Sequence, residues 1–153
     1  MFLITACLFP NQKTLAQSLP AEEPSVVALN HVALYVVDLE VSTTFYRDVL
    51  KLTMIPEPFK DGKHTWFSMG GNSELHLISG LEKATERNKH NHLCFSVKSM
   101  EDMIKIIKER NIPYSDWPGK ANTITIRPDG VKQLYFQDPD GYWIEVNDAF
   151  PGS

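Results

Sequence analysis

The strongest constraint on the fold of this chain is an internal repeat. Residues 30–37 read NHVALYVV, and residues 91–98 read NHLCFSVK. Both segments begin with Asn-His, alternate apolar residues for the length of a strand and run directly into an amphipathic helical pattern. His92 follows His31 by 61 residues, a spacing that is too long for a solenoid repeat and suits a duplicated βαβββ module. The repeat therefore predicts two tandem βαβββ modules in an α+β domain.

Each half of the chain predicts the order strand, helix and three strands. In module one, residues 27–80, we expect a helix that Asp38 caps, with an apolar side formed by Val41, Thr44, Phe45, Val49 and Leu50. The strands of module one are expected at residues 29–37, 53–57, 63–69 and 74–79. In module two, residues 89–148, we expect a helix that Ser99 caps and strands at residues 91–97, 114–117, 132–137 and 142–147. The segment Asp138–Gly141 is predicted to form the turn of the last hairpin.

The far ends of the two modules provide a second check on the repeat. If the last strands correspond, His76 matches Glu145, and these two residues are 69 positions apart. This spacing exceeds that of the two Asn-His segments by 8 residues. The stretch 122–130, which has no counterpart in module one, is about long enough to account for the difference. The duplication is therefore consistent from its first strand to its last.

The alternation of side chains sorts the expected strands into two faces. The apolar face, which must carry the two helices, contains Val32, Leu34, Val36, Phe67, Met69, Leu75, Leu77, Leu93, Phe95, Val97, Leu134, Phe136, Ile144 and Val146. The other face is polar and aromatic. Such a face either lies in water, as in many antiparallel sheets, or lines a cleft on a curved sheet. The histidines and aromatic residues on this face favour the cleft, in a curved, mostly antiparallel sheet with the helices on its outer side.

Four residues on the polar face form a candidate metal site. His31 and His92 stand at the start of the first strand of each module, and His76 and Glu145 stand in the last strand of each. Imidazole nitrogens with one carboxylate suit a divalent metal such as Zn²⁺, Ni²⁺, Co²⁺, Fe²⁺ or Mn²⁺. A single histidine on a strand is more often a hydrogen-bonded residue than a ligand, but four residues at symmetry-related positions favour a metal site.

Two further residues near these positions are weaker candidates. Glu74 shares the face of His76 and is expected at the rim of the cleft. Cys94, two residues after His92, either lines the pocket or is a buried, unreactive thiol.

Composition limits the class of protein and its partners. A chain of 153 residues makes one domain that can bury a core without disulfides, and its two cysteines, Cys7 and Cys94, exclude a disulfide framework. The net charge of −4 and the absence of a Lys/Arg cluster argue against nucleic acid or an anionic membrane as a partner. No apolar stretch is long enough to span a bilayer. A small-molecule substrate is the expected partner.

The beginning of the chain differs in character from the rest. Residues 1–24 are expected to be a leader and linker, and residues 25–153 the folded domain. An apolar run at residues 2–9 and a passable cleavage site at residues 14–16 resemble a secretory signal, although the positive charge that usually opens one is missing. The protein is expected to be periplasmic or secreted if residues 1–16 act as a signal, and otherwise cytoplasmic with a disordered extension.

From Leu29 to about Phe150 the chain resembles the vicinal oxygen chelate (VOC) superfamily. This superfamily includes glyoxalase I, which is a lactoylglutathione lyase, as well as fosfomycin-resistance thiol transferases, methylmalonyl-CoA epimerase, extradiol dioxygenases and bleomycin resistance proteins. The residues that carry the resemblance are NHVAL at 30–34, FYRDVL at 45–50, NHLCF at 91–95 and FQDPDGYWIE at 136–145. Together these segments are specific for the superfamily but not for one of its reactions.

The resemblance implies a glyoxalase-like cup around a divalent metal, commonly in a homodimer whose sites draw ligands from both chains. Glyoxalase-like members have ligands at the positions of His31, His76, His92 and Glu145. His76 departs from the pattern, because bacterial glyoxalase I usually has Glu there. In the thiol transferases and extradiol dioxygenases, the matching ligands would be His31, His92 and Glu145 alone.

The resemblance also implies a glyoxalase-type lyase that isomerises a substrate chelating the metal through vicinal oxygens. Glu145 would then be the catalytic base. By strand parity, the substrate pocket would be walled by Tyr35, Trp66, Tyr135 and Trp143. Three alternatives remain open: an Fe²⁺ extradiol-type dioxygenase, a fosfomycin-type thiol transferase and a non-catalytic drug-binding protein of the bleomycin resistance type.

Overall fold

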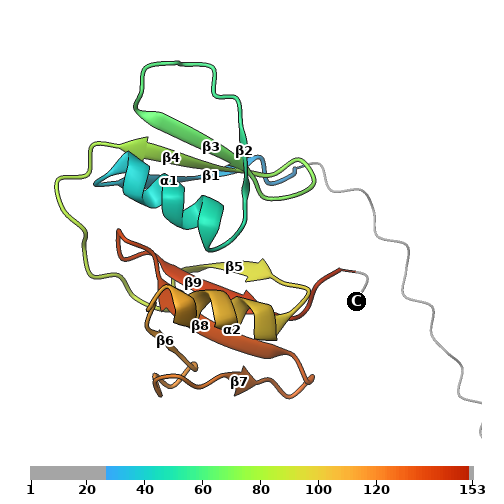
Figure 1. Ribbon diagram of the computed structural model, residues 1–153. Coiled ribbons are helices and arrows are strands. Elements are labelled where there is room, and N and C mark those ends of the chain that lie inside the picture. The colour runs from blue at the N-terminus through green and yellow to red at the C-terminus, as the bar shows by residue number, and fades with distance from the viewer. Residues whose placement is uncertain (1–26, 152–153) are drawn as a thin grey trace, which may run out of the picture.

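The computed structural model describes residues 27–151, which form two βαβββ modules, the second with an additional short strand that was not predicted (Figure 1). Module one contains β1 (His31–Val36), α1 (Leu39–Asp48), β2 (Thr53–Ile55), β3 (His64–Ser68) and β4 (Glu74–Ser79). Module two contains β5 (His92–Ser96), α2 (Met100–Glu109), β6 (Tyr114–Ser115), β7 (Thr125–Ile126), β8 (Lys132–Gln137) and β9 (Trp143–Asn147). The predicted leader, with its signal at residues 1–16, lies outside the described residues, so export stays a prediction.

The two modules build separate mixed sheets with the same strand order. Module one has the order β1-β4-β3-β2, and module two has β5-β9-β8-β6, with β7 also paired to β8. In each module the first and last strands run parallel, whereas the remaining pairs are antiparallel. The predicted α+β fold of two tandem modules is confirmed. Among the described residues, however, the modules do not join into one continuous curved sheet.

Local sequence signals mark the N-terminal ends of both helices. The Asp38 carboxylate accepts a hydrogen bond from the Val41 amide at 3.0 Å, and the Ser99 hydroxyl accepts one from the Asp102 amide at 3.1 Å. These N-caps satisfy amides that the first turn leaves without helical partners, as predicted. Among residues 27–151, neither helix is long and apolar enough to cross a membrane.

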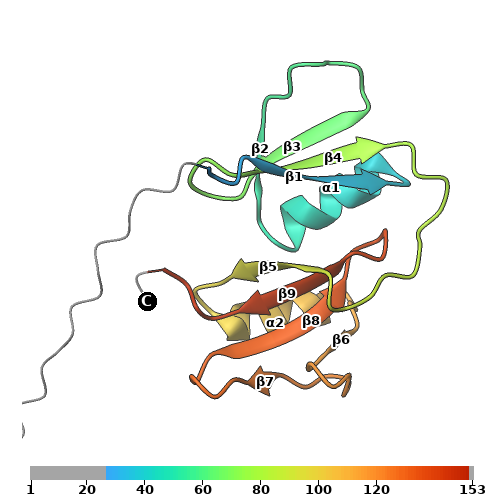
Figure 2. The same ribbon diagram turned by 180° about the vertical axis from the view of Figure 1, so that it is seen from behind.

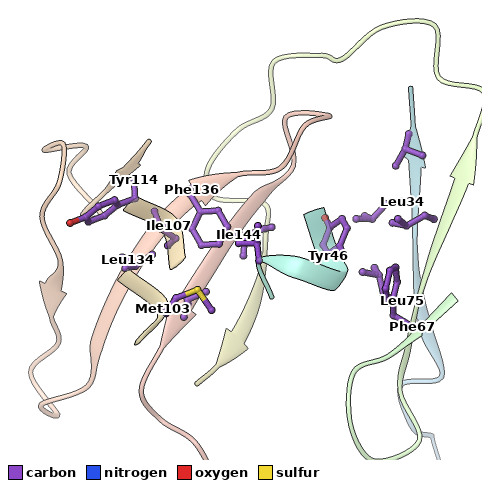
Figure 3. Close-up of a cluster of buried hydrophobic side chains, with 14 of the residues drawn as sticks. Leu34, Tyr46, Phe67, Leu75, Met103, Ile107, Tyr114, Leu134, Phe136 and Ile144 are labelled. Carbon is purple, nitrogen blue, oxygen red and sulfur yellow. The ribbon is translucent and has the colours of Figure 1, made fainter. Parts of the chain in front are cut away.

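The core lies on the helix-covered face of each sheet. Every residue predicted for the apolar face is either buried or packed against the buried cluster. Figure 3 shows Leu34, Phe67 and Leu75 of module one directed toward Tyr46 of α1, with Phe136 and Ile144 of module two on the other side of that ring. Tyr46 is fully buried, so α1 belongs to the cores of both modules.

Helix α1 lies between the sheet of module one and module two (Figures 1 and 2). The Tyr46 hydroxyl donates to Asp138 Oδ2 at 2.7 Å, and the Ser42 hydroxyl donates to Asp140 Oδ2 at 2.6 Å. Asp140 Oδ1 also accepts a hydrogen bond from the Val37 amide at 2.7 Å. Buried hydrogen bonds to carboxylates are strong, so these contacts fix α1 against the β8–β9 turn. The polar face of the module-one sheet, opposite α1, therefore faces away from module two.

Candidate metal centre

The module-one half-site, which we define as His31, Trp66, Glu74 and His76, lies on the polar face of β1, β3 and β4. Its imidazole and indole rings form a stack. The centroids of Trp66 and His76 are 3.8 Å apart with an interplanar angle of 3°, and those of His76 and His31 are 4.2 Å apart at 10°. These residues line a hollow of about 520 Å³, to which Phe59 and His64 also contribute.

Hydrogen-bond partners show which ring nitrogen donates in each of the two module-one histidines. His31 Nδ1 lies 2.7 Å from the Asn30 amide oxygen, which can only accept a hydrogen bond. Nδ1 therefore donates, which leaves Nε2 as the ring nitrogen that could bind a metal. His76 Nε2 lies 2.8 Å from Glu74 Oε2, so His76 donates from Nε2 to this carboxylate. Glu74, which was expected at the rim of the cleft, has a partly exposed side chain and accepts this hydrogen bond.

The module-two half-site, which we define as His92, Tyr135 and Glu145, lies on the polar face of β5, β8 and β9. His92 Nε2 is 3.2 Å from Glu145 Oε2. His92 Nδ1 donates to the Lys89 carbonyl oxygen at 2.9 Å, which leaves Nε2 directed at the Glu145 carboxylate. The two equivalent histidines, His31 and His92, therefore both donate from Nδ1 to a neighbouring oxygen.

Several donors hold the Glu145 carboxylate. The Tyr135 hydroxyl donates to Oε2 at 2.5 Å, and Asn147 Nδ2 donates to Oε1 at 3.2 Å. The Cys94 thiol, in a residue that is exposed rather than buried, donates to Oε1 at 3.4 Å. Burial opposes ionisation of Glu145, but these hydrogen bonds and the neighbouring His92 outweigh it and lower the pKa of the carboxyl. Burial and Glu145 raise the pKa of Cys94 to about 12, so the thiol stays a donor.

The structure brings the predicted ligands together in two pairs rather than as one group of four. His76 and Glu145 occupy equivalent positions, since His76 pairs with Trp66 and Glu145 pairs with Tyr135 in the strand register. Among residues 27–151, no group of three or more His, Cys, Asp or Glu side chains could hold a metal ion. Because the module-one half-site faces away from module two, the two pairs do not meet within one chain.

The predicted pocket aromatics also divide between the modules. Trp66 lines the module-one hollow, and Tyr135 and Trp143 line a hollow of about 420 Å³ in module two. Tyr35 lies in neither of them. Its hydroxyl packs against Gly80, and its backbone amide donates to the Tyr142 hydroxyl at 3.1 Å. Four residues of extended strand separate Tyr35 from His31 by about 13 Å, so a shared face does not place both in one pocket.

This combination of paired βαβββ modules and two histidine-containing half-sites defines the class of protein. A family model described as the Glyoxalase/Bleomycin resistance protein/Dioxygenase superfamily matches residues 28–146, and the chain belongs to this superfamily. Among curated relatives, Metallothiol transferase FosB of Staphylococcus saprophyticus is 27% identical over 128 residues, which cover 80% of this chain and 77% of that protein.

Two further relatives extend the comparison. Glyoxylase I 4 of Arabidopsis thaliana is 31% identical over 127 residues, covering 79% of this chain and 70% of that protein. The solved structure of Oxidase ChaP-H1 superposes with a TM-score of 0.66 at 25% identity, covering 83% of this chain and 99% of that one. The names of these three relatives describe different reactions, so membership of the superfamily does not by itself select one.

Proposed function

We propose that this protein is a divalent-metal-dependent enzyme that catalyses a glyoxalase-type isomerisation of a small molecule with vicinal oxygens. The observation that carries the proposal is the approach of His92 Nε2 to Glu145 Oε2 at 3.2 Å. His92 Nδ1 is held by the Lys89 carbonyl, and the Glu145 carboxylate is held at Oε2 by Tyr135 and at Oε1 by Asn147. Ligands oriented in this way by a surrounding shell of hydrogen bonds are characteristic of metal sites.

The donor set fits a divalent metal. His31 and His92 would each bind the metal through Nε2, because Nδ1 of each ring is held by a neighbouring oxygen, and Glu145 would add a carboxylate oxygen. Two imidazoles and one carboxylate suit Zn²⁺, Ni²⁺, Co²⁺, Fe²⁺ or Mn²⁺. We propose these three residues as ligands, with His76 as the fourth. A metal bound there would act as a Lewis acid toward the two substrate oxygens.

The surrounding residues of the chain would bind and orient the substrate. Trp66, Tyr135 and Trp143 would exclude water from it. Glu145 would move the proton between adjacent substrate carbons, as the base of a glyoxalase-type reaction requires. The hydroxyl of Tyr135 would keep this carboxylate ionised and correctly placed.

We further propose that the complete centre forms in a homodimer, with module one of one copy facing module two of the other. The support is that the two half-sites lie on faces that do not meet within one chain. Mixing the variants His31→Ala and His92→Ala tests this arrangement. If ligands come from two copies, a mixed dimer contains one intact centre, and about a quarter of the wild-type metal content returns at equal mixing. If both variants stay metal-free after unfolding and refolding together, the shared centre is refuted.

One observation favours a second candidate function. His76 Nε2 is bonded to Glu74, and the His76 ring is stacked between Trp66 and His31. These contacts would favour a three-residue ligand set of His31, His92 and Glu145. That set matches the thiol transferases and dioxygenases rather than the lyases.

Metal analysis followed by three assays separates these reactions. The purified protein is stripped with a chelator, reloaded with each metal, and tested with a methylglyoxal–glutathione hemithioacetal, with fosfomycin plus a thiol, and with a catechol plus oxygen. The proposal expects lyase activity that is lost on chelation and restored by metal. Absence of any restorable metal binding would refute every metal-dependent reaction and leave the drug-binding alternative.

Position 76 provides the sharper test of the ligand set. Under the glyoxalase proposal, His76→Glu restores the carboxylate usual in glyoxalase I, so lyase activity should persist or rise. Under the three-ligand alternative, His76→Ala should leave metal affinity within about threefold of wild type, because no ligand is removed. A much larger loss of affinity in His76→Ala would exclude the three-ligand set.

A further inference from the structure

Lys89, in the linker between the modules, is held by several hydrogen bonds to module two. It lies three residues before β5, and its ammonium group donates three hydrogen bonds. The acceptors are the Asp116 carbonyl at 2.6 Å, the Ser115 hydroxyl at 3.1 Å and the Trp117 carbonyl at 3.2 Å. All three acceptors belong to residues 115–117, which follow or end β6. Lys89 therefore ties the linker between the modules to this segment.

The same ammonium group lies among aromatic rings of module two. Its nitrogen is 4.5 Å from the ring centroid of Tyr135, 5.1 Å from that of Trp143 and 5.8 Å from that of Trp117. A cation within about 6 Å of an aromatic face is attracted by the ring quadrupole. Lys89 thus draws Trp117 toward Tyr135, and the centroids of these two rings are 5.4 Å apart.

Trp117 in turn closes one side of the module-two half-site. Its ring lies 6.4 Å from the ring of His92 in an edge-on arrangement, and the residue remains 39% exposed. An aromatic side chain that packs against two site residues and still faces solvent can contact a bound small molecule.

The backbone of Lys89 acts on the same site. Its carbonyl oxygen accepts the hydrogen bond from His92 Nδ1. The Lys89 side chain also contacts the ring of Tyr135, whose hydroxyl donates to Glu145. Lys89 therefore orients His92 directly, through its carbonyl oxygen, and contacts Tyr135, the residue that orients Glu145.

We propose that Lys89 is a positioning residue of the module-two half-site: it holds Trp117 and residues 115–117 as a wall of the substrate pocket and steadies His92. The wall is a property of the folded chain. The effect on His92 as a ligand rests on the function proposed above.

The first test uses the metal-free protein and requires no activity. Indole ¹⁵N relaxation is measured for wild type and Lys89→Met, with the Trp117 resonance assigned through Trp117→Phe. The order parameter of the Trp117 indole should be near 0.85 in wild type and fall below about 0.6 in Lys89→Met, because the three hydrogen bonds are lost. Lys89→Arg, which can still donate to the same oxygens, should retain most of the order.

Lys83→Met is the matched control, since Lys83 is an exposed lysine of the same linker. It should leave the Trp117 indole unchanged. An equally rigid Trp117 in wild type and Lys89→Met would overturn the proposal.

The second test is Co²⁺ titration followed by visible absorption. Lys89→Met should weaken Co²⁺ binding about 3- to 10-fold, less than the 10- to 100-fold typical for loss of a ligand's hydrogen-bond partner, because the Lys89 carbonyl remains. If Lys89 acts through Trp117, the effects of Lys89→Met and Trp117→Ala on Co²⁺ affinity should overlap. The double variant should then lose less affinity than the product of the two single-variant fold losses. Full additivity would refute a role for Lys89 through Trp117. If wild type binds no Co²⁺, the proposed function fails, while the indole measurement still decides whether Lys89 positions the wall.

Discussion

Replacing Asp138 with asparagine removes a buried carboxyl group from the contact between the modules. Asp138 is 6% exposed, and its Oδ2 accepts the Tyr46 hydroxyl while Oδ1 accepts the amides of Asp140 and Tyr142. Burial raises the pKa of Asp138 from 3.8 to about 6, although the hydrogen bonds from Tyr46 and Tyr142 oppose the shift. The folded protein therefore binds the Asp138 proton more tightly than the unfolded chain.

The magnitude follows from this difference in pKa. A rise from 3.8 to about 6 corresponds to about 3 kcal/mol of folding free energy. Because the folded pKa is the higher one, this stabilisation is complete below pH 3.8 and is lost as the pH rises through about 6. Between pH 4 and pH 7, the free energy of unfolding of wild type should fall by about 2–3 kcal/mol relative to Asp138→Asn, which has no proton to lose.

Urea unfolding of metal-free protein, followed by circular dichroism at pH 4, 5, 6 and 7, measures the effect. The matched control is Asp129→Asn, which makes the same change in net charge at an exposed carboxylate. The reasoning is refuted if the difference between wild type and Asp138→Asn stays within about 0.5 kcal/mol across the range, the usual scale of surface substitutions. It is also refuted if that difference grows in favour of wild type as the pH rises.

Three further substitutions test local features of the fold by the same urea assay. Gly141→Ala should cost about 1–3 kcal/mol, because residue 141 has φ +82° and an added Cβ would lie 2.6 Å from the Thr85 carbonyl oxygen; an unchanged midpoint would contradict this. Asp38→Ala should cost about 1 kcal/mol through loss of the α1 N-cap, and a neutral result would show that the cap does not contribute. Tyr46→Phe should cost about 1–3 kcal/mol at pH 7, because Asp138 loses its hydroxyl donor, and equal stability to wild type would exclude that bond as a stabilising contact.

The helix α1 shows where sequence patterns stop being sufficient. Its N-cap at Asp38 is confirmed, because a cap depends on residues three positions apart. The expected apolar side included Val41, but Val41 is 51% exposed, whereas Ser42 and Tyr46 are buried. Ser42 and Tyr46 face inward because they bond to the carboxylates of Asp140 and Asp138, about 90 to 100 residues further along the chain. Hydrophobic periodicity carries no information about such partners.

The candidate site likewise contains some features that strand periodicity predicts and others that only the folded chain shows. Strand parity puts His92 and Glu145 on one face, and the parallel pairing of β5 with β9 brings their side chains to 3.2 Å. Parity also put Tyr35 on the face of His31, but distance along the strand removes it from the hollow. The contacts of Lys89 and Trp117 were missed, because both lie in loops where no period applies and where only the folded chain brings residues 89 and 117 together.

The repeated Asn-His segment was enough to determine two βαβββ modules, the helix-covered face of each sheet and the equivalence of His31 with His92. These properties follow from local periodicity, which each segment carries in its own residues. Only the tertiary structure decided how the modules sit together. Tyr46 and Ser42 bond to the β8–β9 turn and hold α1 between the two sheets, so the two half-sites face apart in one chain. The duplication thus supplies both halves of the proposed centre, and the buried contact between the modules separates them within a single copy.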